Sequence, residues 1–303
     1  MFDRTYQLLV YYGSDSANSG KCHTHNKQKS HVGEFDKNMT TDKVKKPVAR
    51  KLLLKLLGSR DDIQMNAATA VRVGALFGIS ENNVRVTLNR LHSANLLSLV
   101  ERGYYQLGQK GKQFAGEINQ WRNAESLLTS WHNDWIVVQT SMLAKSDKKQ
   151  QRHNTRALKL FGMQRLVNDM YVRPNNMKAS VNEIRQKLLT VGLSKEALVF
   201  SACDFEQRIQ QKACKLWHGE RLEKHYREGI DELQQSLDSL STMPLEDALI
   251  ASYEVGDNAI HDLVFDPLLP APLVNASLRE QYRALVKHYD DVGSQIWYQF
   301  LHG

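Results

Sequence analysis

The residues best suited to chemistry lie between positions 80 and 107, where a polar helix precedes a short hairpin. At 100° per residue, Val84, Leu88 and Leu91 share one side of a helix over 81–94 and can pack inward. The opposite side and its flank carry the residues that we expect to face DNA bases: Asn82, Asn83, Arg85, Val86, Asn89 and Arg90. Arginine pairs with guanine, asparagine pairs with adenine, and an exposed valine can contact a thymine methyl group. This pattern favours a helix that reads the major groove.

The neighbouring segments can position such a helix. Helices are predicted over 48–57, with Pro47 in the first turn and Gly58 at the end, and over 66–77. Gly78-Ile79-Ser80 is typical of a tight turn in which the serine caps the next helix. Strands over 97–100 and 104–107 would form a hairpin. This order of elements is that of a winged helix-turn-helix.

Positive charge is concentrated in the same region. Residues 43–125 hold fourteen Lys/Arg and six Asp/Glu, whereas 126–303 hold 21 and 22, and 1–42 hold five of each. Such a basic module is expected for binding to the phosphate backbone, although a merely basic soluble domain is the alternative. We expect Arg102, at the hairpin tip, to enter a minor groove. Phosphates would be held by Lys45, Lys46, Arg50 and Lys51.

The remaining chain predicts further α and β structure. A helical linker over 112–128 is followed by strands over 135–142, 164–172 and 197–203, which alternate with helices over 148–161 and 180–191. This order favours a small ferredoxin-like α+β sandwich. Later segments are helical, over 207–217, 221–240, 245–265 and 277–301. The fold class is therefore α+β and mostly helical.

Five regions follow from this interpretation. They are a disordered tail or extension (1–42), the winged helix-turn-helix (43–111), a helical linker (112–130), the ferredoxin-like middle domain (131–206) and a helical C-terminal domain for effector binding and dimerisation (207–303). Cys22, His23, His25 and His31 lack a second ligand pair at a regular spacing, so no metal site is predicted. No apolar run approaches the roughly 20 residues of a membrane span, and the three cysteines match no disulfide framework, so we expect a cytoplasmic protein.

The segments Gly78–Leu91 and Arg102–Leu107 resemble the DNA-binding module of the PaaX family, bacterial repressors related to the regulator of phenylacetic acid catabolism. Trp135-Ile136-Val137-Val138, Leu160-Phe161-Gly162 and Asp266-Pro267-Leu268-Leu269-Pro270 are also similar to that family's middle and C-terminal domains. The likeness covers about residues 45–300.

The resemblance implies a repressor that binds double-stranded operator DNA as a homodimer and is released by a small effector, an acyl-CoA thioester in the best-known relatives. It also implies a winged helix, a Cas2-like middle domain and a helical C-terminal domain. One departure concerns the effector: Ile260 and His261 stand where relatives carry arginines, about five or six positions before Asp266.

Candidate effector residues are therefore only weakly indicated. A cationic helix could bind the phosphates of such a ligand, although a solvated face or an extra DNA contact is the more common role of such a run. Trp217, Arg221, His261 and Asp266 combine aromatic, basic and polar character, although packing and helix-end roles are the alternative. On the cationic helix the candidates are Lys149, Arg152 and Arg156.

Two other functions compete with the repressor hypothesis. A Cas2-like metal-dependent nuclease needs a carboxylate at the end of its first strand, where this chain has Gln139-Thr140-Ser141-Met142. The winged helix could instead serve as a protein-interaction module. No nucleotide-binding loop, nucleophile elbow or zinc-hydrolase helix appears, so neither an enzyme nor a cofactor is predicted.

Overall fold

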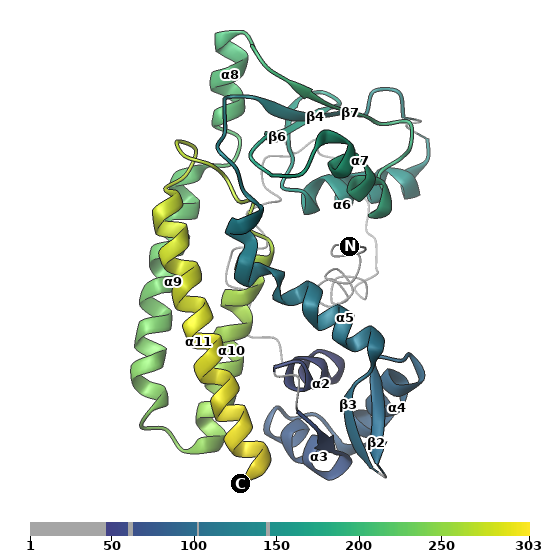
Figure 1. The fold of residues 1–303 in the computed structure, drawn as a ribbon, viewed down its shortest axis with the longest axis vertical. Helices are drawn as coiled ribbons and strands as arrows, with labels where there is room; N and C mark the ends of the chain where they lie inside the picture. The colour runs from purple at the N-terminus through teal and green to yellow at the C-terminus, as the bar shows by residue number, and fades with distance from the viewer. Residues whose placement is uncertain (1–46, 60–62, 102, 144–145) are drawn as a thin grey trace, which may run out of the picture. The chain divides into compact units, whose positions relative to one another are not determined.

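The computed structural model describes residues 47–59, 63–101, 103–143 and 146–303, which form an α+β fold that is mostly helical and contains two small antiparallel sheets (Figure 1). Two compact units divide these residues. Unit 1 contains 117–242 and 255–292, and unit 2 contains the residues up to Gly116 together with 243–254 and 293–303. Within the described ranges, no helix is both long and apolar enough to cross a membrane.

Three helices of unit 2 follow the sequence prediction closely. They are α2 (Ala49–Leu57), α3 (Ala67–Leu76) and α4 (Glu81–Ser93). The Asn66 side chain accepts a hydrogen bond from the Thr69 amide, which supplies a partner for one of the free N–H groups at the start of α3.

A three-stranded sheet completes the first part of unit 2. Strands β2 (Leu97–Glu101) and β3 (Tyr104–Leu107) form the predicted hairpin, and the short β1 (Met65–Asn66), which was not predicted, adds to its other edge. The strand order is β1-β3-β2, with every pair antiparallel. Helix α5 (Gln109–Ile118) follows.

The core of unit 2 joins residues that are far apart in the sequence. Buried side chains of α2 and α3 pack with others from α10 (Leu245–Val264) and α11 (Ala276–His302). Phe77 lies 5.1 Å from Tyr253 and 6.3 Å from Trp297, measured between ring centroids. The cluster comprises Leu52, Leu56, Val73, Phe77, Leu249, Tyr253, Trp297 and Phe300. The helix-and-hairpin segment therefore does not form its core alone.

The sheet of unit 1 has four strands in the order β5-β6-β4-β7. The strands are β4 (Trp135–Gln139), β5 (Gln164–Val167), β6 (Met170–Pro174) and β7 (Leu198–Ala202). All three pairings are antiparallel. Helices α6 (Lys148–Leu160) and α7 (Val181–Thr190) cover one side of this sheet (Figure 1). Their apolar faces meet Ile136, Val138 and Val199 in a second core.

Two strand predictions need correction. The segment 164–172 was predicted as one strand, but the chain turns at Asn168-Asp169 and forms the hairpin β5–β6, because these two polar residues favour a turn over a continuous strand. The first strand ends at Gln139 instead of continuing to Met142. The resulting order is β-α-β-β-α-β, with one strand more than predicted.

The rest of unit 1 is helical. The 3-10 segment η3 (Asn119–Leu127) precedes the sheet, and α8 (Gln207–Cys214) and α9 (Gly219–Leu240) follow it. His218, with φ of +50°, separates α8 from α9. Helices α9, α10 and α11 run side by side (Figure 1). The predicted tail 1–42, with its cysteine and histidines, lies outside the described residues.

Candidate nucleic-acid interface

Helix α4 packs against the rest of unit 2 through its apolar side. Val84, Leu88 and Leu91 are all buried, and the Ser80 hydroxyl oxygen accepts a hydrogen bond from the Asn83 amide at 3.4 Å. Gly74 of α3 lies so close that a Cβ placed there would be 2.5 Å from Val84 Cγ2. The missing side chain of Gly74 thus permits α3 and α4 to approach each other closely.

The outward side of α4 is exposed along its whole length. All six residues that the sequence assigned to base contacts are solvent-exposed, and Val86 is 36% exposed. The six are Asn82, Asn83, Arg85, Val86, Asn89 and Arg90. None of them contributes to the buried core, so packing within the protein does not require these particular side chains.

Contacts within this face are weak ones. Arg85 Nε donates to Glu81 Oε1 at 2.7 Å, and both side chains are more than half exposed. Exposed ion pairs of this kind contribute about 0.2–1 kcal/mol. Thr87 Oγ1 donates to Asn83 Oδ1 at 3.3 Å. Breaking the contact between Arg85 and Glu81 would therefore cost little, which leaves the Arg85 guanidinium available to another partner.

The hairpin β2–β3 presents apolar side chains that the sequence analysis did not select. Leu99 is 47% exposed, Val100 is 45% exposed and Tyr104 is 39% exposed. Gly103 has φ of +86°, a left-handed conformation that glycine adopts without strain. Apart from its chain neighbours, no described residue has an atom within 4 Å of a Cβ placed there. Arg102 lies outside the described residues. Leu99 and Val100 belong to the strand predicted over 97–100 and Tyr104 begins the one predicted over 104–107, so the sequence shows their apolar character but not their exposure.

The basic start of unit 2 is described only in part. Arg50 is exposed at the start of α2, and Lys51 is half-buried. Further along α2, Lys55 Nζ lies 4.6 Å from the centroid of the Tyr253 ring. Lys45 and Lys46, which were predicted to contact phosphates, fall outside the described residues. Of the two predicted phosphate contacts that the structure describes, Arg50 is thus the more exposed.

The seven candidate effector residues are spread over unit 1. Lys149, Arg152 and Arg156 are exposed on α6, and among the described residues no hydrogen bond or ion pair joins them to the other four. Arg221 is exposed on α9. Trp217 is buried: its indole Nε1 donates to the Gly162 carbonyl at 2.9 Å and its ring stacks on Trp135. The packing role is the one that these contacts of Trp217 favour.

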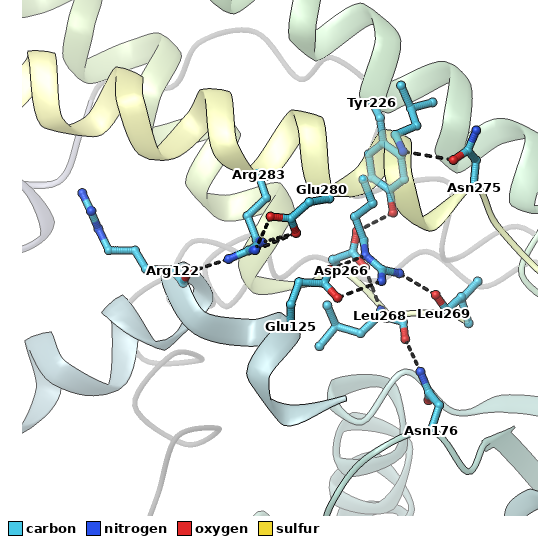
Figure 2. Close-up of polar contacts among 12 residues, drawn as sticks. Arg122, Glu125, Asn176, Tyr226, Asp266, Leu268, Leu269, Asn275, Glu280 and Arg283 are labelled. Atoms are coloured by element: carbon cyan, nitrogen blue, oxygen red, sulfur yellow. Dashed lines mark hydrogen bonds and ion pairs between the residues drawn. The ribbon is translucent and has the colours of Figure 1, made fainter. Parts of the chain in front are cut away.

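Asp266 lies at the centre of a polar cluster within unit 1 (Figure 2). Its Oδ2 accepts a hydrogen bond from the Tyr226 hydroxyl at 2.5 Å, and its Oδ1 accepts one from the Leu268 amide at 2.7 Å. Burial raises the pKa of Asp266, while the charge of Arg279 opposes that rise. Burial, followed by the charge of Asp266, raises the pKa of Tyr226, so the phenol stays protonated and donates. Both carboxylate oxygens thus have partners within the chain.

Arg279 connects this cluster to η3. Its guanidinium is 2% exposed, and it donates to Glu125 Oε1 at 2.9 Å and to the Leu269 carbonyl at 2.5 Å. Arg283, four residues further along α11, adds a second contact to η3, since its Nη1 donates to the Arg122 carbonyl (Figure 2). These basic residues were not selected from the sequence, because the contacts that join η3 to α11 link positions more than 150 residues apart.

A second buried arginine holds the loop after α10 against the sheet. Arg173 of β6 donates to the Phe161 carbonyl at 2.8 Å and to Asn176 Oδ1 at 3.3 Å. Asn176 Nδ2 in turn donates to the Leu268 carbonyl at 2.7 Å (Figure 2). Burial lowers the pKa of Arg173 to about 10. The segment Asp266–Pro270 therefore hydrogen-bonds to α9, to α11 and to Asn176, which follows β6, and these contacts fix its position within unit 1.

A histidine–carboxylate pair joins α9 to α10. His225 Nε2 lies 2.8 Å from Asp262 Oδ2, and His261 Nδ1 lies 3.7 Å from Asp262 Oδ1. The hydrogen bond with Asp262 raises the pKa of His225. Burial opposes ionisation of Asp262, but the hydrogen bonds from His225 and His261 bring its pKa below the ordinary value. The candidate effector residue His261 thus already has a carboxylate neighbour within the chain.

A Cas2-like nuclease would need a carboxylate at the end of β4, and this chain has the amide of Gln139 there. Gln139 closes β4, and its buried Oε1 has no hydrogen-bond partner among the residues that the structure describes. Asp204 and Glu206 follow β7 and are exposed. Within the described part of the chain, no group of three or more His, Cys, Asp or Glu residues is arranged to hold a metal ion.

Comparisons with known proteins identify a shared fold only. No family model matches the chain, and no curated protein matches it. Among solved structures, the chain is similar to the uncharacterized protein Rv0674 from Mycobacterium tuberculosis, with a TM-score of 0.61 and 16% sequence identity. The match covers 84% of this chain and 98% of that one. At this identity the likeness extends to the fold alone.

Proposed function

We propose that the protein is a DNA-binding transcriptional regulator that reads an operator with helix α4. The observation that carries the proposal is the exposed side of α4, where Arg85, Val86 and Asn89 project away from a core formed by the other side. These residue types match the donor, acceptor and methyl pattern of the major groove. The excess of positive charge over 43–125 supports backbone binding by the same module.

The arrangement of elements supports a finer description of the fold. Helices α2, α3 and α4 with the hairpin β2–β3 have the composition of a winged helix-turn-helix, in which α4 is the recognition helix and the hairpin is the wing. The sheet order β5-β6-β4-β7 with two helices on one side is that of a ferredoxin-like domain. We propose a repressor of the PaaX type on these grounds and on the sequence resemblance.

The operator-binding proposal is tested by a gel shift on DNA upstream of the protein's own gene and its neighbours. Excess competitor DNA and near-physiological salt are needed because backbone binding alone is sequence-independent. We expect a discrete shift for the wild type, and its loss in an Arg85→Ala/Asn89→Ala variant, since each good bidentate contact contributes about 1–3 kcal/mol of discrimination.

A matched control changes one cation and one amide elsewhere in unit 2. Gln109 and Lys110 are exposed at the start of α5, so Gln109→Ala/Lys110→Ala removes the same charge without altering α4. It should retain the discrete shift. A shift that is indifferent to Arg85→Ala/Asn89→Ala, or the absence of any specific shift, would favour a winged helix that binds proteins.

The proposal includes a homodimer, a cytoplasmic location and release by a small effector. Operators of dimeric helix-turn-helix proteins are palindromic, so sedimentation of the complex should give two protomers per site. An acyl-CoA thioester is the effector class proposed from the family resemblance. Titration calorimetry against a panel of such thioesters tests it, and the absence of heat with all of them would exclude that class.

A further inference from the structure

Helix α6 carries a continuous stripe of cations that the proposed recognition helix does not explain. The five basic residues are Lys148, Lys149, Arg152, Arg156 and Lys159. At 100° per residue they fall within an arc of about 100°, and the rise of about 1.5 Å per residue extends the stripe over about 16 Å. The buried residues Asn154, Ala157 and Leu158 lie on the other side of the helix.

The charge of this stripe is not neutralised within the part of the chain that the structure describes. All five side chains are exposed, and none of them forms an ion pair or hydrogen bond with another described residue. Helix α6 itself contains no Asp or Glu. Asp147, just before it, uses its side chain to cap the helix by accepting from the Gln150 amide. The loop that contacts α6 near Gly192 adds Lys195 and Glu196, whose charges cancel.

We propose that this α6 stripe binds the phosphate backbone of duplex DNA, as a second contact in addition to that of α4; the inference rests on the proposed function. A row of cations about 16 Å long matches an extended polyanion, since duplex DNA carries one charge per roughly 1.7 Å of its axis. The stripe occupies the convex side of a single helix, whereas small ligands bind in concave sites. It also contains no aromatic or large apolar side chain that would enter a membrane surface.

The salt dependence of DNA binding provides the test. The full chain is titrated with a 30-base-pair duplex of arbitrary sequence, and with any promoter fragment that it shifts, at several salt concentrations. The stripe variant is Lys149→Gln/Arg152→Gln/Arg156→Gln. If all three residues contact phosphates, the slope of log affinity against log salt should flatten by about two to three, since each lost contact removes about 0.9.

A matched control removes three exposed cations from another helix of unit 1. Arg208, Lys212 and Lys215 lie on or directly after α8 and have no ion-pair partner among the described residues. Arg208→Gln/Lys212→Gln/Lys215→Gln causes the same change in net charge. It should keep the wild-type slope, which separates a local contact from a general effect of charge.

The outcomes distinguish this inference from the proposed function. An unchanged slope in the stripe variant overturns the α6 contact, even where Arg85→Ala/Asn89→Ala abolishes the promoter shift and so upholds operator reading. A flattened slope without any promoter preference in the wild type upholds the stripe and overturns operator reading. Weaker binding of an acyl-CoA by the stripe variant, with its DNA slope unchanged, overturns the α6 contact. Failure of the wild type to bind any duplex overturns both.

Discussion

His225 and Asp262 form a contact between α9 and α10 whose strength depends on pH. Their side chains are 24% and 19% exposed, and Glu228, Asp266, His261 and Tyr282 also face the pair. The pKa of His225 is raised above 6.5, so its contribution to stability is complete below that pH and is lost as pH rises through the raised value. Because the pKa of Asp262 is lowered, its contribution to stability is complete above pH 3.8 and is lost as pH falls through the lowered value.

We therefore predict that His225→Gln lowers the free energy of unfolding most between pH 4 and pH 6.5, by about 1.5–3 kcal/mol, the usual contribution of a hydrogen bond to a charged group. The difference from the wild type should shrink above this range. Urea unfolding at several pH values measures it, with His288→Gln, an exposed histidine of α11, as the control. A difference that is constant with pH would show that the pair is not charged as described.

The candidate effector residues illustrate how far single residues can be interpreted from sequence. Asp266 and Trp217 were selected for their chemical character, but the carboxylate of Asp266 is occupied by Tyr226 and the Leu268 amide, and Trp217 is part of an aromatic stack. Local composition gives the chemistry that a side chain offers. It does not give the partners that use this chemistry, because those partners come from other elements (Figure 2).

At the scale of elements, the position of α4 depends on its close packing against α3 at Gly74. Gly74→Ala should lower the free energy of unfolding by about 1–3 kcal/mol, because the new Cβ would lie 2.5 Å from Val84 Cγ2 and overpacking has costs of this size. The same variant should weaken operator binding, since α4 must shift or tilt to make room. Thermal unfolding and the gel shift measure the two effects.

Gly116→Ala provides the comparison, because it makes the same change in α5 with nothing within 4 Å of the new Cβ. Alanine favours a helix over glycine by about 0.8–1 kcal/mol, so this variant should be more stable than the wild type. A Gly74→Ala protein that gains stability to the same extent would mean that α3 and α4 do not pack as described.

The elements themselves were largely predictable, with exceptions that have physical causes. Periodicity located α2, α3, α4 and the four later helices to within a few residues, because each has one apolar side. The hairpin β5–β6 was missed, since Val167 and Met170 extend an apolar run on both sides of Asn168-Asp169. The strand β1 has only two residues, too few for any periodic signal.

At the scale of the molecule, unit 2 is assembled from three separate parts of the chain. Trp297 of α11 stacks on Phe77 and lies edge-on to Tyr253, so it fills the core beneath the proposed DNA-binding module. Apolar periodicity predicts the helices of residues 245–265 and 277–301 but not this packing, because it shows that a helix has a buried face without showing which element covers that face. The excess of positive charge that ends near residue 125 likewise reflects surface composition, and it does not mark where the core of unit 2 ends, since that core includes residues from 249 to 300.

Trp297→Ala should therefore lower the free energy of unfolding by about 3–5 kcal/mol, the usual cost of deleting a buried aromatic side chain. Operator binding should fall with it, although residue 297 is far from α4 in the sequence. Tyr298→Ala, at an exposed neighbouring position, should have a much smaller effect on both. Calorimetry measures the change in stability, and the gel shift measures operator binding. A Trp297→Ala protein that is as stable as the wild type and binds the operator with the same affinity would show that residues 47–116 do not depend on α11 for their core.

The composite core of unit 2 has a consequence for biosynthesis. The ribosome makes α2, α3 and α4 early, but Phe77 has no Trp297 or Phe300 to pack against until residues 293–303 have left the exit tunnel. Until then, a nascent chain would hold α4, the proposed recognition helix, without the core that Trp297 and Phe300 complete. Chains released before that point, by a premature stop codon or a stalled ribosome, would lack this core, and if the proposed function holds they would not compete with the finished protein for DNA.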